Sequence, residues 1–221
     1  MKSTQSTSRY SQFLAPLVRP FPDFDVPFIA PFRRNAISRL ALKPGDRVLD
    51  VGCGSGGSFR YLLDAVGPQG EVVGIELSPT IAAFAKRRIE KNGWPNAKVI
   101  EAPAQTASLD GKFDGAIMFG ANELFTSKDV LDNVFAHLKD DAGVVVMGAK
   151  LVADGALRGL NPLYRMMTSK LMLPSTPALN YKPFELLQGR MREFHIEDRA
   201  GGLLFLAWGT VKAPGTARAN P

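Results

Sequence analysis

An aspartate and three alternate glycines stand together in one short stretch of the sequence and could form a ligand site. The stretch is Asp50-Val51-Gly52-Cys53-Gly54-Ser55-Gly56, and it follows the apolar residues Val48 and Leu49. Glycine has no Cβ and adopts backbone angles that other residues avoid, so a turn here could bring bare backbone against a ligand. The acid before the first glycine would repel a pyrophosphate, but it would attract an ammonium or sulfonium group.

The residues on either side of the glycines would place them at the edge of a parallel sheet. Residues 47–51 are typical of a buried strand. Residues 58–63 read as the start of a helix, whose first backbone amides would point back at the turn. Gly52, Gly54 and Gly57 also match the dinucleotide spacing G-x-G-x-x-G. A dinucleotide site and a plain turn without a ligand are therefore the alternatives.

With its acid, the stretch resembles the first motif of the class I S-adenosylmethionine-dependent methyltransferases, [D/E]-x-G-x-G-x-G. S-adenosylmethionine carries both an ammonium and a sulfonium group. The resemblance covers residues 44–150 and, less closely, two apolar stretches near the C-terminus. It implies an enzyme with S-adenosylmethionine as its cofactor and an α/β, doubly wound (Rossmann-like), mostly parallel seven-stranded sheet. A C-terminal antiparallel hairpin and added N-terminal and lid helices would complete the fold.

A second acid, Glu76, ends a second apolar stretch about 20 residues beyond the glycines. Nucleotide-binding sheets place there the carboxylate that accepts hydrogen bonds from ribose hydroxyls. The resembled family often has an aspartate after the third strand for the adenine, but Pro103 stands here, so adenine recognition would rest on Ala104 or Gln105. The cofactor-binding residues that we expect are Asp50, Gly52, Cys53, Gly54, Gly56, Glu76, Leu77, Ala104, Gln105 and Phe119.

The rest of the central region alternates between strand and helix patterns, which requires a parallel sheet with helices on both faces. We expect strands over residues 71–76, 97–102, 113–120 and 143–149, and a closing hairpin from residues 194–199 and 203–212. We expect helices over residues 31–42, 79–91 and from Ser127, the last with an apolar stripe that ends at Leu138. In the first of these helices, the side chains expected to face inward are Ile37, Leu40 and Ala41, and those expected outward are Arg33, Arg34 and Arg39.

Methyl transfer from a sulfonium is an in-line displacement of an activated methyl group, so the protein mainly has to align two reactants. A hydroxyl acceptor also benefits from a base, for which Glu123 and Tyr164 are the candidates. The residues expected to contact the acceptor are Tyr10, Asn122, Glu123, Tyr164 and Tyr181. No Asn-Pro-Pro-Tyr run follows the fourth strand, which argues against methylation of planar nitrogens. We expect no metal, since His137, His195 and Cys53 form no ligand cluster in the sequence.

Charge divides the chain into three parts. Residues 45–153 hold 11 basic and 14 acidic residues, whereas residues 1–44 hold 7 and 2, and residues 154–221 hold 9 and 5. We expect residues 1–44 to form an N-terminal cap segment and residues 45–221 to form the methyltransferase domain, with residues 154–190 as an inserted lid. Both flanks are also rich in aromatic residues, Leu and Met, which favours a small, apolar or lipid-like acceptor over nucleic acid and allows contact with a membrane surface.

The remaining features concern the compartment and the competing functions. The N-terminus lacks the apolar core of a signal peptide, no apolar run approaches the roughly 20 residues of a membrane span, and the single cysteine fits a reducing cytoplasm. An NAD(P)-dependent oxidoreductase is one alternative function, but Asp50 and the closing hairpin oppose it. A non-catalytic module that binds S-adenosylmethionine is the other.

Overall fold

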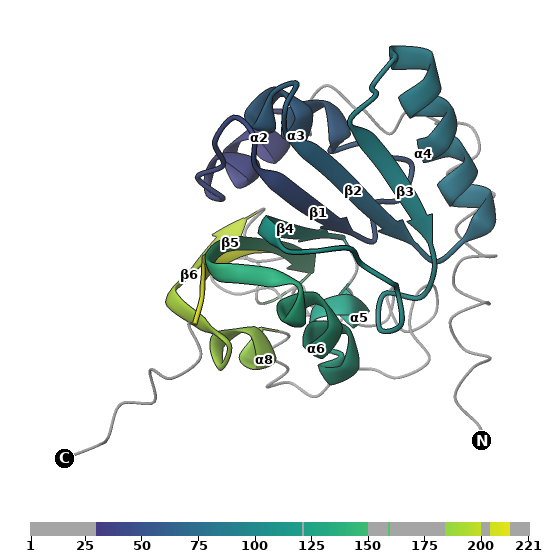
Figure 1. Cartoon of the computed structure of the whole chain (residues 1–221). Helices are drawn as coiled ribbons and strands as arrows, with labels where there is room; N and C mark the ends of the chain where they lie inside the picture. The colour runs from purple at the N-terminus through teal and green to yellow at the C-terminus, as the bar shows by residue number, and fades with distance from the viewer. Residues whose placement is uncertain (1–29, 121, 150–158, 160–183, 200–203, 213–221) are drawn as a thin grey trace, which may run out of the picture.

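Seven strands form one sheet in the computed structural model, which describes residues 30–120, 122–149, 159, 184–199 and 204–212 (Figure 1). The strands are β1 (Arg47–Val51), β2 (Glu71–Glu76), β3 (Ala97–Glu101), β4 (Phe113–Phe119), β5 (Leu138–Ala149), β6 (Met191–Arg199) and β7 (Leu204–Val211). Their order across the sheet is β3-β2-β1-β4-β5-β7-β6, with β1 to β5 parallel. Strand β7 runs antiparallel between β5 and β6, so the predicted closing hairpin is confirmed.

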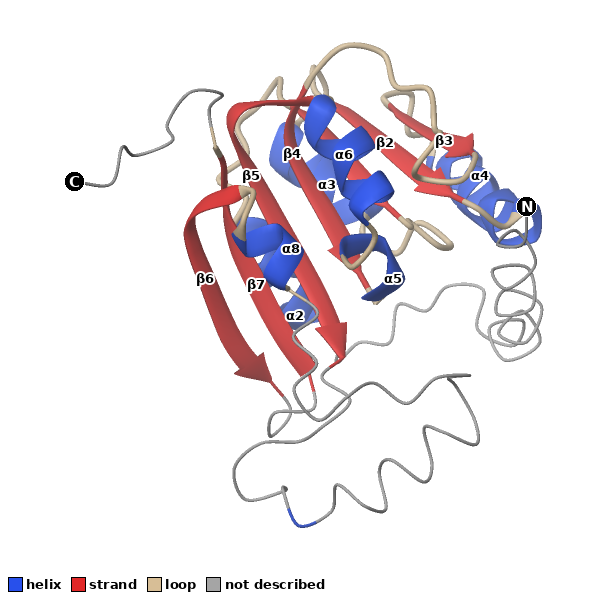
Figure 2. Cartoon of the chain, turned by 90° about the horizontal axis from the view of Figure 1, so that it is seen from below, coloured by secondary structure: helices blue, strands red, loops and turns tan. Residues whose placement is uncertain are grey.

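Helices cover both faces of the sheet (Figures 1 and 2). One face carries α2 (Ala30–Ser38), α3 (Phe59–Val66) and α4 (Pro79–Asn92), and the other carries α5 (Asn122–Phe125), α6 (Lys128–Ala136) and α8 (Glu185–Gln188). Successive residues of β1 point to opposite faces, so Val48 packs in the core with Leu62 of α3 and Leu49 packs in the core with Leu131 of α6. None of the helices in the described ranges is long and apolar enough to span a membrane.

Two helices begin at the capping residues that the sequence suggests. Ser78 precedes α4, and its Oγ accepts a hydrogen bond of 3.5 Å from the Ile81 N–H. Ser127 precedes α6 and accepts in the same way from the Val130 N–H at 3.4 Å. Helix α4 ends at Gly93, whose φ of 62° suits glycine. The predicted helix starts after Ser78 and Ser127 are therefore confirmed.

The boundary between α6 and β5 differs from the prediction. The helix ends at Ala136, and Leu138 opens the strand five residues before the expected start. Leu138 pairs with Phe113 of β4 and is buried in the core, so its apolar side chain serves the sheet rather than a helical stripe. Asp141 has a φ of 65°, and the β4–β5 register shifts just after Phe113, which makes this start of the strand irregular.

Helix α2 also ends earlier than expected, at Ser38 rather than Leu42. Leu40 is buried as predicted, but Ala41 is exposed with a φ of 53°, so its inward placement was wrong. The backbone of Leu40 rests directly on β5, because a Cβ on Gly143 would lie 2.6 Å from the Leu40 carbonyl oxygen. This contact turns the chain out of the helix and fixes α2 against the sheet.

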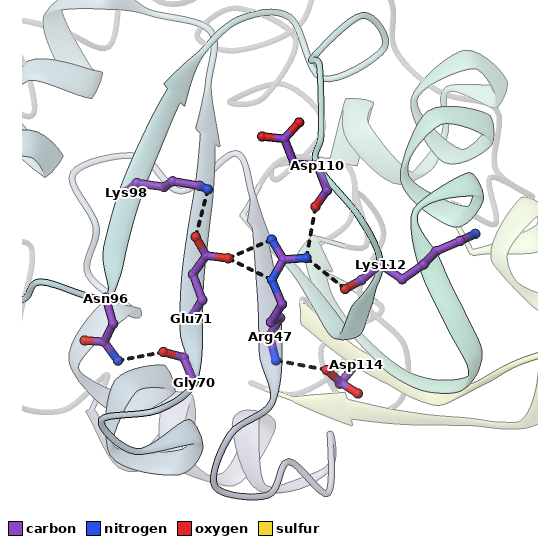
Figure 3. Close-up of polar contacts among 8 residues, drawn as sticks. All are labelled: Arg47, Gly70, Glu71, Asn96, Lys98, Asp110, Lys112 and Asp114. Atoms are coloured by element: carbon purple, nitrogen blue, oxygen red, sulfur yellow. Dashed lines mark hydrogen bonds and ion pairs between the residues drawn. The ribbon is translucent and has the colours of Figure 1, made fainter.

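Charged side chains tie the strands together at the amino edge of the sheet, opposite the glycine turn (Figure 3). The Arg47 guanidinium contacts Glu71 on β2 at 2.7 Å, and Lys98 of β3 reaches the same carboxylate at 2.7 Å. Arg47 also donates to the Asp110 carbonyl at 2.9 Å, and its backbone N–H donates to Asp114 of β4 at 2.9 Å. Partial burial opposes ionisation of Glu71, but the Lys98 and Arg47 hydrogen bonds hold its pKa below the ordinary value. These contacts brace the sheet where its parallel strands begin. The candidate site lies at the opposite side of the sheet, where those strands end.

Candidate cofactor site at the carboxyl edge of the sheet

The glycine turn follows β1 and is hydrogen-bonded to β2. Gly52, Gly54 and Gly56 all have positive φ, at 73°, 57° and 77°. The N–H groups of Gly52 and Cys53 both donate to the Ile75 carbonyl, at 2.8 and 2.9 Å. A Cβ on Gly54 would meet nothing within 4 Å, so the backbone at this point borders open space. The turn therefore presents bare backbone at the carboxyl edge of the sheet.

Asp50 is a buried carboxylate with an unsatisfied oxygen. Its side chain is 2% exposed, and Oδ2 has no hydrogen-bond partner among the described residues. Burial raises the pKa of Asp50 to about 7, the Arg33 guanidinium lowers it, and the Glu76 charge raises it further. Because buried acceptors normally have a donor, the free lone pairs of Oδ2 fit a ligand with an N–H group or a positive charge.

Glu76 lies at the end of β2 and spans the gap to the turn. Its Oε2 accepts from the Gly54 N–H at 3.1 Å, and its Oε1 accepts from the Ser78 N–H at 2.9 Å. Burial raises the pKa of Glu76, the N–H donors lower it, and the charge of Glu123 adds to the rise. The carboxylate is thus held in place by backbone donors, and it ties the glycine turn to the start of α4.

Arg33 of α2 lies at the glycine turn, which corrects the prediction that it faces outward. Both Nη atoms of its guanidinium lie 2.8 Å from the position that a Cβ on Gly57 would occupy. Arg33 precedes the buried residues Ala36 and Ile37 by three and four positions, so it shares their face of the helix. This spacing was a usable signal, but the charge of the side chain favoured the outward interpretation.

Two further side chains pack around the turn. Arg88 of α4, which the sequence analysis did not single out, donates through Nη1 to the Gly56 carbonyl at 3.4 Å. Cys53 is buried between the turn and Gly74 of β2, where a Cβ would lie 2.6 Å from its Sγ. Burial raises the pKa of the Cys53 thiol, and the charges of Asp50 and Glu76 add to this rise. The thiol thus stays protonated and acts as a packing group.

The residues expected to contact an adenine follow β3. The Ala102 N–H donates to the Glu76 carbonyl at 3.1 Å, which ties this segment to the end of β2. Pro103 and Gln105 are exposed, whereas Ala104 is buried and its carbonyl accepts a hydrogen bond of 2.8 Å from Asn133. Gln105 is therefore an exposed polar side chain beside this strand end, and Leu77 is 40% exposed beyond β2.

The residues expected near the acceptor lie at the end of β4 and on α5. Phe119 is half-buried, and α5 is held by Phe125, which is buried at the core. Glu123 is exposed, and its charge acts on Glu76, so the two carboxylates lie close enough to interact. The Asn122 side chain is directed onto β5, since its Oδ1 lies 2.5 Å from where a Cβ on Gly148 would stand. The other acceptor candidates, Tyr10, Tyr164 and Tyr181, lie outside the described residues.

Comparisons with known proteins find methyltransferases. A family model for a methyltransferase domain matches residues 48–141. Demethylmenaquinone methyltransferase of Geobacillus kaustophilus is 28% identical over 171 residues, which cover 76% of this chain and 72% of that protein. The "Probable cobalt-precorrin-6B C(15)-methyltransferase (decarboxylating)" of Saccharolobus solfataricus is 37% identical over 94 residues, 41% of this chain and 47% of that protein. This chain thus spans about half the length of the second relative.

A solved structure has the same architecture. The SAM dependent methyltransferase from Aquifex aeolicus has a TM-score of 0.57 and 19% identity, and the match covers 81% of this chain and 89% of that one. Together with the glycine turn, these matches support a class I S-adenosylmethionine-dependent methyltransferase, with S-adenosylmethionine as the cofactor. The oxidoreductase alternative gains no support from these matches.

Proposed function

We propose that the protein transfers the methyl group of S-adenosylmethionine to a small, largely apolar acceptor. The observation that carries this proposal is the unsatisfied Oδ2 of Asp50 beside the open backbone of Gly54. A buried anion with a free acceptor suits the ammonium of a methionyl group, and a pyrophosphate would gain nothing from it. The relatives named as methyltransferases support the same reaction class.

Each residue of the site would have a separate task in holding the cofactor. Asp50 would accept from the ammonium, and the backbone at Gly54 would lie against the ligand. Glu76 would accept from the ribose hydroxyls, for which its carboxylate is already oriented by the Ser78 N–H. Gln105 and the backbone near it would serve the adenine. When bound, S-adenosylmethionine supplies a methyl group that is already activated on a sulfonium.

The acceptor would approach from the end of β4. Phe119 offers an aromatic surface there, and Glu123 is exposed to solvent close to Glu76. An acceptor with a hydroxyl group would transfer the hydroxyl proton to a general base. Among the described residues, Glu123 is the candidate for this base. An amine or an activated carbon would need only alignment, which the edge of the sheet would provide.

The class of acceptor rests on the relatives and on the flanks of the sequence. The relatives include methyltransferases named for demethylmenaquinone, for aklanonic acid and for a cobalt-precorrin. These names support an acceptor built around rings rather than a free sugar or a nucleic acid. The aromatic and Met-rich flanks and their basic charge would suit such a molecule, with or without an anionic group. The proposal places the enzyme in the cytoplasm, which the single cysteine supports.

The test is a screen with methyl-labelled S-adenosylmethionine against pools of quinones, polyketides, tetrapyrroles and lipids, with nucleic acid and protein as further pools. Transfer of label into a ring-containing acceptor, lost in Asp50→Asn, is the expected result. Label found only in nucleic acid or protein would contradict the proposed acceptor class. Cofactor binding without transfer to any pool would favour a non-catalytic binding module.

A further inference from the structure

The position of Arg33 has a consequence for how the cofactor is held. Its guanidinium lies over Gly57, with Nη1 and Nη2 equally distant, at 2.8 Å, from the site of a Cβ. Its charge also reaches Asp50, whose pKa it lowers. A cation and a buried anion therefore border the same turn, one from α2 and one from β1.

A methionyl group carries the matching pair of charges, an ammonium and a carboxylate on one carbon. Asp50 offers an acceptor to the ammonium, and a carboxylate beside it would need a cationic donor. We propose that Arg33 binds the carboxylate of the cofactor's methionyl group, an inference that rests on the proposed function. The planar guanidinium fork can donate two parallel hydrogen bonds to a carboxylate, which fixes its direction as well as its charge.

The surroundings of Arg33 fit this role. Helix α2 is held against the sheet by Ala36, Ile37 and Leu40, all buried, so the base of the Arg33 side chain has a fixed position. Gly57 supplies the space for its tip, because a Cβ there would lie 2.9 Å from Cζ. The φ of Gly57 is outside the left-handed region, so the missing side chain, rather than an unusual backbone, accounts for a glycine here.

Arg34 provides a matched control one residue further along. It is exposed, and its guanidinium stacks over the Tyr61 ring at 5.4 Å from the centroid. Replacing Arg34 by Gln removes the same charge from the same helix. A general electrostatic effect on an anionic ligand would appear in both variants, whereas a direct contact would appear only in Arg33→Gln.

The experiment compares the affinities of S-adenosylmethionine and decarboxylated S-adenosylmethionine by calorimetry. The parent should favour the carboxylated cofactor, and Arg33→Gln should weaken that cofactor by about tenfold to hundredfold with little change for the decarboxylated one. Arg34→Gln should keep the preference of the parent. An effect of Arg33 exerted only through the protonation of Asp50 would weaken both ligands equally, because both retain the ammonium, and would overturn the inference.

A second variant moves the guanidinium without removing its charge. In Gly57→Ala the new Cβ would displace the tip of Arg33, and the preference for the carboxylated cofactor should fall while thermal unfolding without cofactor stays close to the parent's. An Arg33→Gln protein that keeps the parent's preference would refute the role of Arg33 and leave the proposed function intact. A parent protein that binds neither ligand would instead refute the proposed function itself.

Discussion

Asp50, which we propose accepts a hydrogen bond from the cofactor's ammonium group, also carries a cost to stability. Its pKa is raised from 3.8 to about 7 in the folded protein, chiefly by burial. Between these values the folded state binds more protons at this group than the unfolded state, so its contribution to stability is lost as pH rises toward 7. A buried charge that destabilises the free protein is expected where a ligand later supplies the partner.

Asp50→Asn should therefore stabilise the protein without cofactor at pH 8, by on the order of 4 kcal/mol, because no buried charge has to form. The gain should shrink as the pH falls from 7 toward 3.8, because the folded parent's carboxyl is then protonated and the unfolded carboxyl becomes progressively protonated too. Urea unfolding of both proteins at pH 5 and pH 8 measures the difference. A gain that does not change with pH would show that the charge of Asp50 is not its cause.

Glu76 should matter for affinity more than an acid at the end of a neighbouring strand. Removing one charged hydrogen-bonding group typically costs about 1.5–3 kcal/mol, so Glu76→Ala should bind S-adenosylmethionine roughly tenfold to hundredfold more weakly. The control is Glu101→Ala, since Glu101 pairs in register with Glu76 and is exposed beside Lys86. Equal affinities for the two variants would indicate that Glu76 only ties the turn to α4.

At the scale of single residues, the positions of Asp50 and Glu76 could be predicted from the sequence, because they depend on neighbouring residues alone. Glu76 is the last residue of β2 and Asp50 is the last but one of β1, and this position places both near the carboxyl ends of the parallel strands. The position of Arg33 at the glycine turn could not be predicted, because it depends on how α2 packs against the turn. That packing depends on Gly57, which lies 24 residues further along the chain.

Among the elements, the glycine turn is the one whose backbone matters most. Gly54 has a φ of 57° and Gly93, at the end of α4, has a φ of 62°, and a Cβ on either would meet nothing within 4 Å. Valine at either position should therefore strain the backbone by a similar amount, about 1–2 kcal/mol. The two glycines form a matched pair that separates strain from ligand contact.

Gly54→Val should abolish binding of S-adenosylmethionine, because the side chain enters the space where the backbone meets the ligand. Gly93→Val should lose a similar amount of stability and bind as the parent does. Calorimetry for binding and thermal unfolding for stability measure both effects. If Gly54→Val stays folded and binds normally, the cofactor does not lie against this turn.

The ends of a helix with local capping residues could be predicted well. A boundary between a helix and a strand that depends on contacts across the sheet could not. Ser78 and Gly93 delimit α4 through local hydrogen bonds and a positive φ, so the sequence around them was enough. The end of α6 depends instead on the pairing of Leu138 with Phe113 across the sheet. At Leu138 the apolar spacing of a helix overlaps with the start of a strand, and the contact across the sheet decides between the two.

For the whole molecule, the fold around the glycine turn and the identity of the cofactor could be predicted from the sequence, whereas the shape of an acceptor site could not. The family model covers residues 48–141, which hold the glycine turn, Glu76 and the end of β4. Cofactor binding by this fold uses backbone turns and strand ends, which leave spacing patterns in a sequence. An acceptor site depends on the shape that side chains from separate segments form together, and such a shape leaves no comparable pattern. The charge asymmetry of the flanks indicates a class of ligand but no geometry.

The central claim is that S-adenosylmethionine binds at the turn between β1 and α3 through Asp50. Calorimetric titration of the parent and of Asp50→Asn with S-adenosylmethionine, and of the parent with NADH, tests it most directly. S-adenosylmethionine should bind the parent and should bind Asp50→Asn at least about tenfold more weakly. NADH should show no binding to the parent. Equal binding of S-adenosylmethionine to both proteins, or tight binding of NADH to the parent, would contradict the claim.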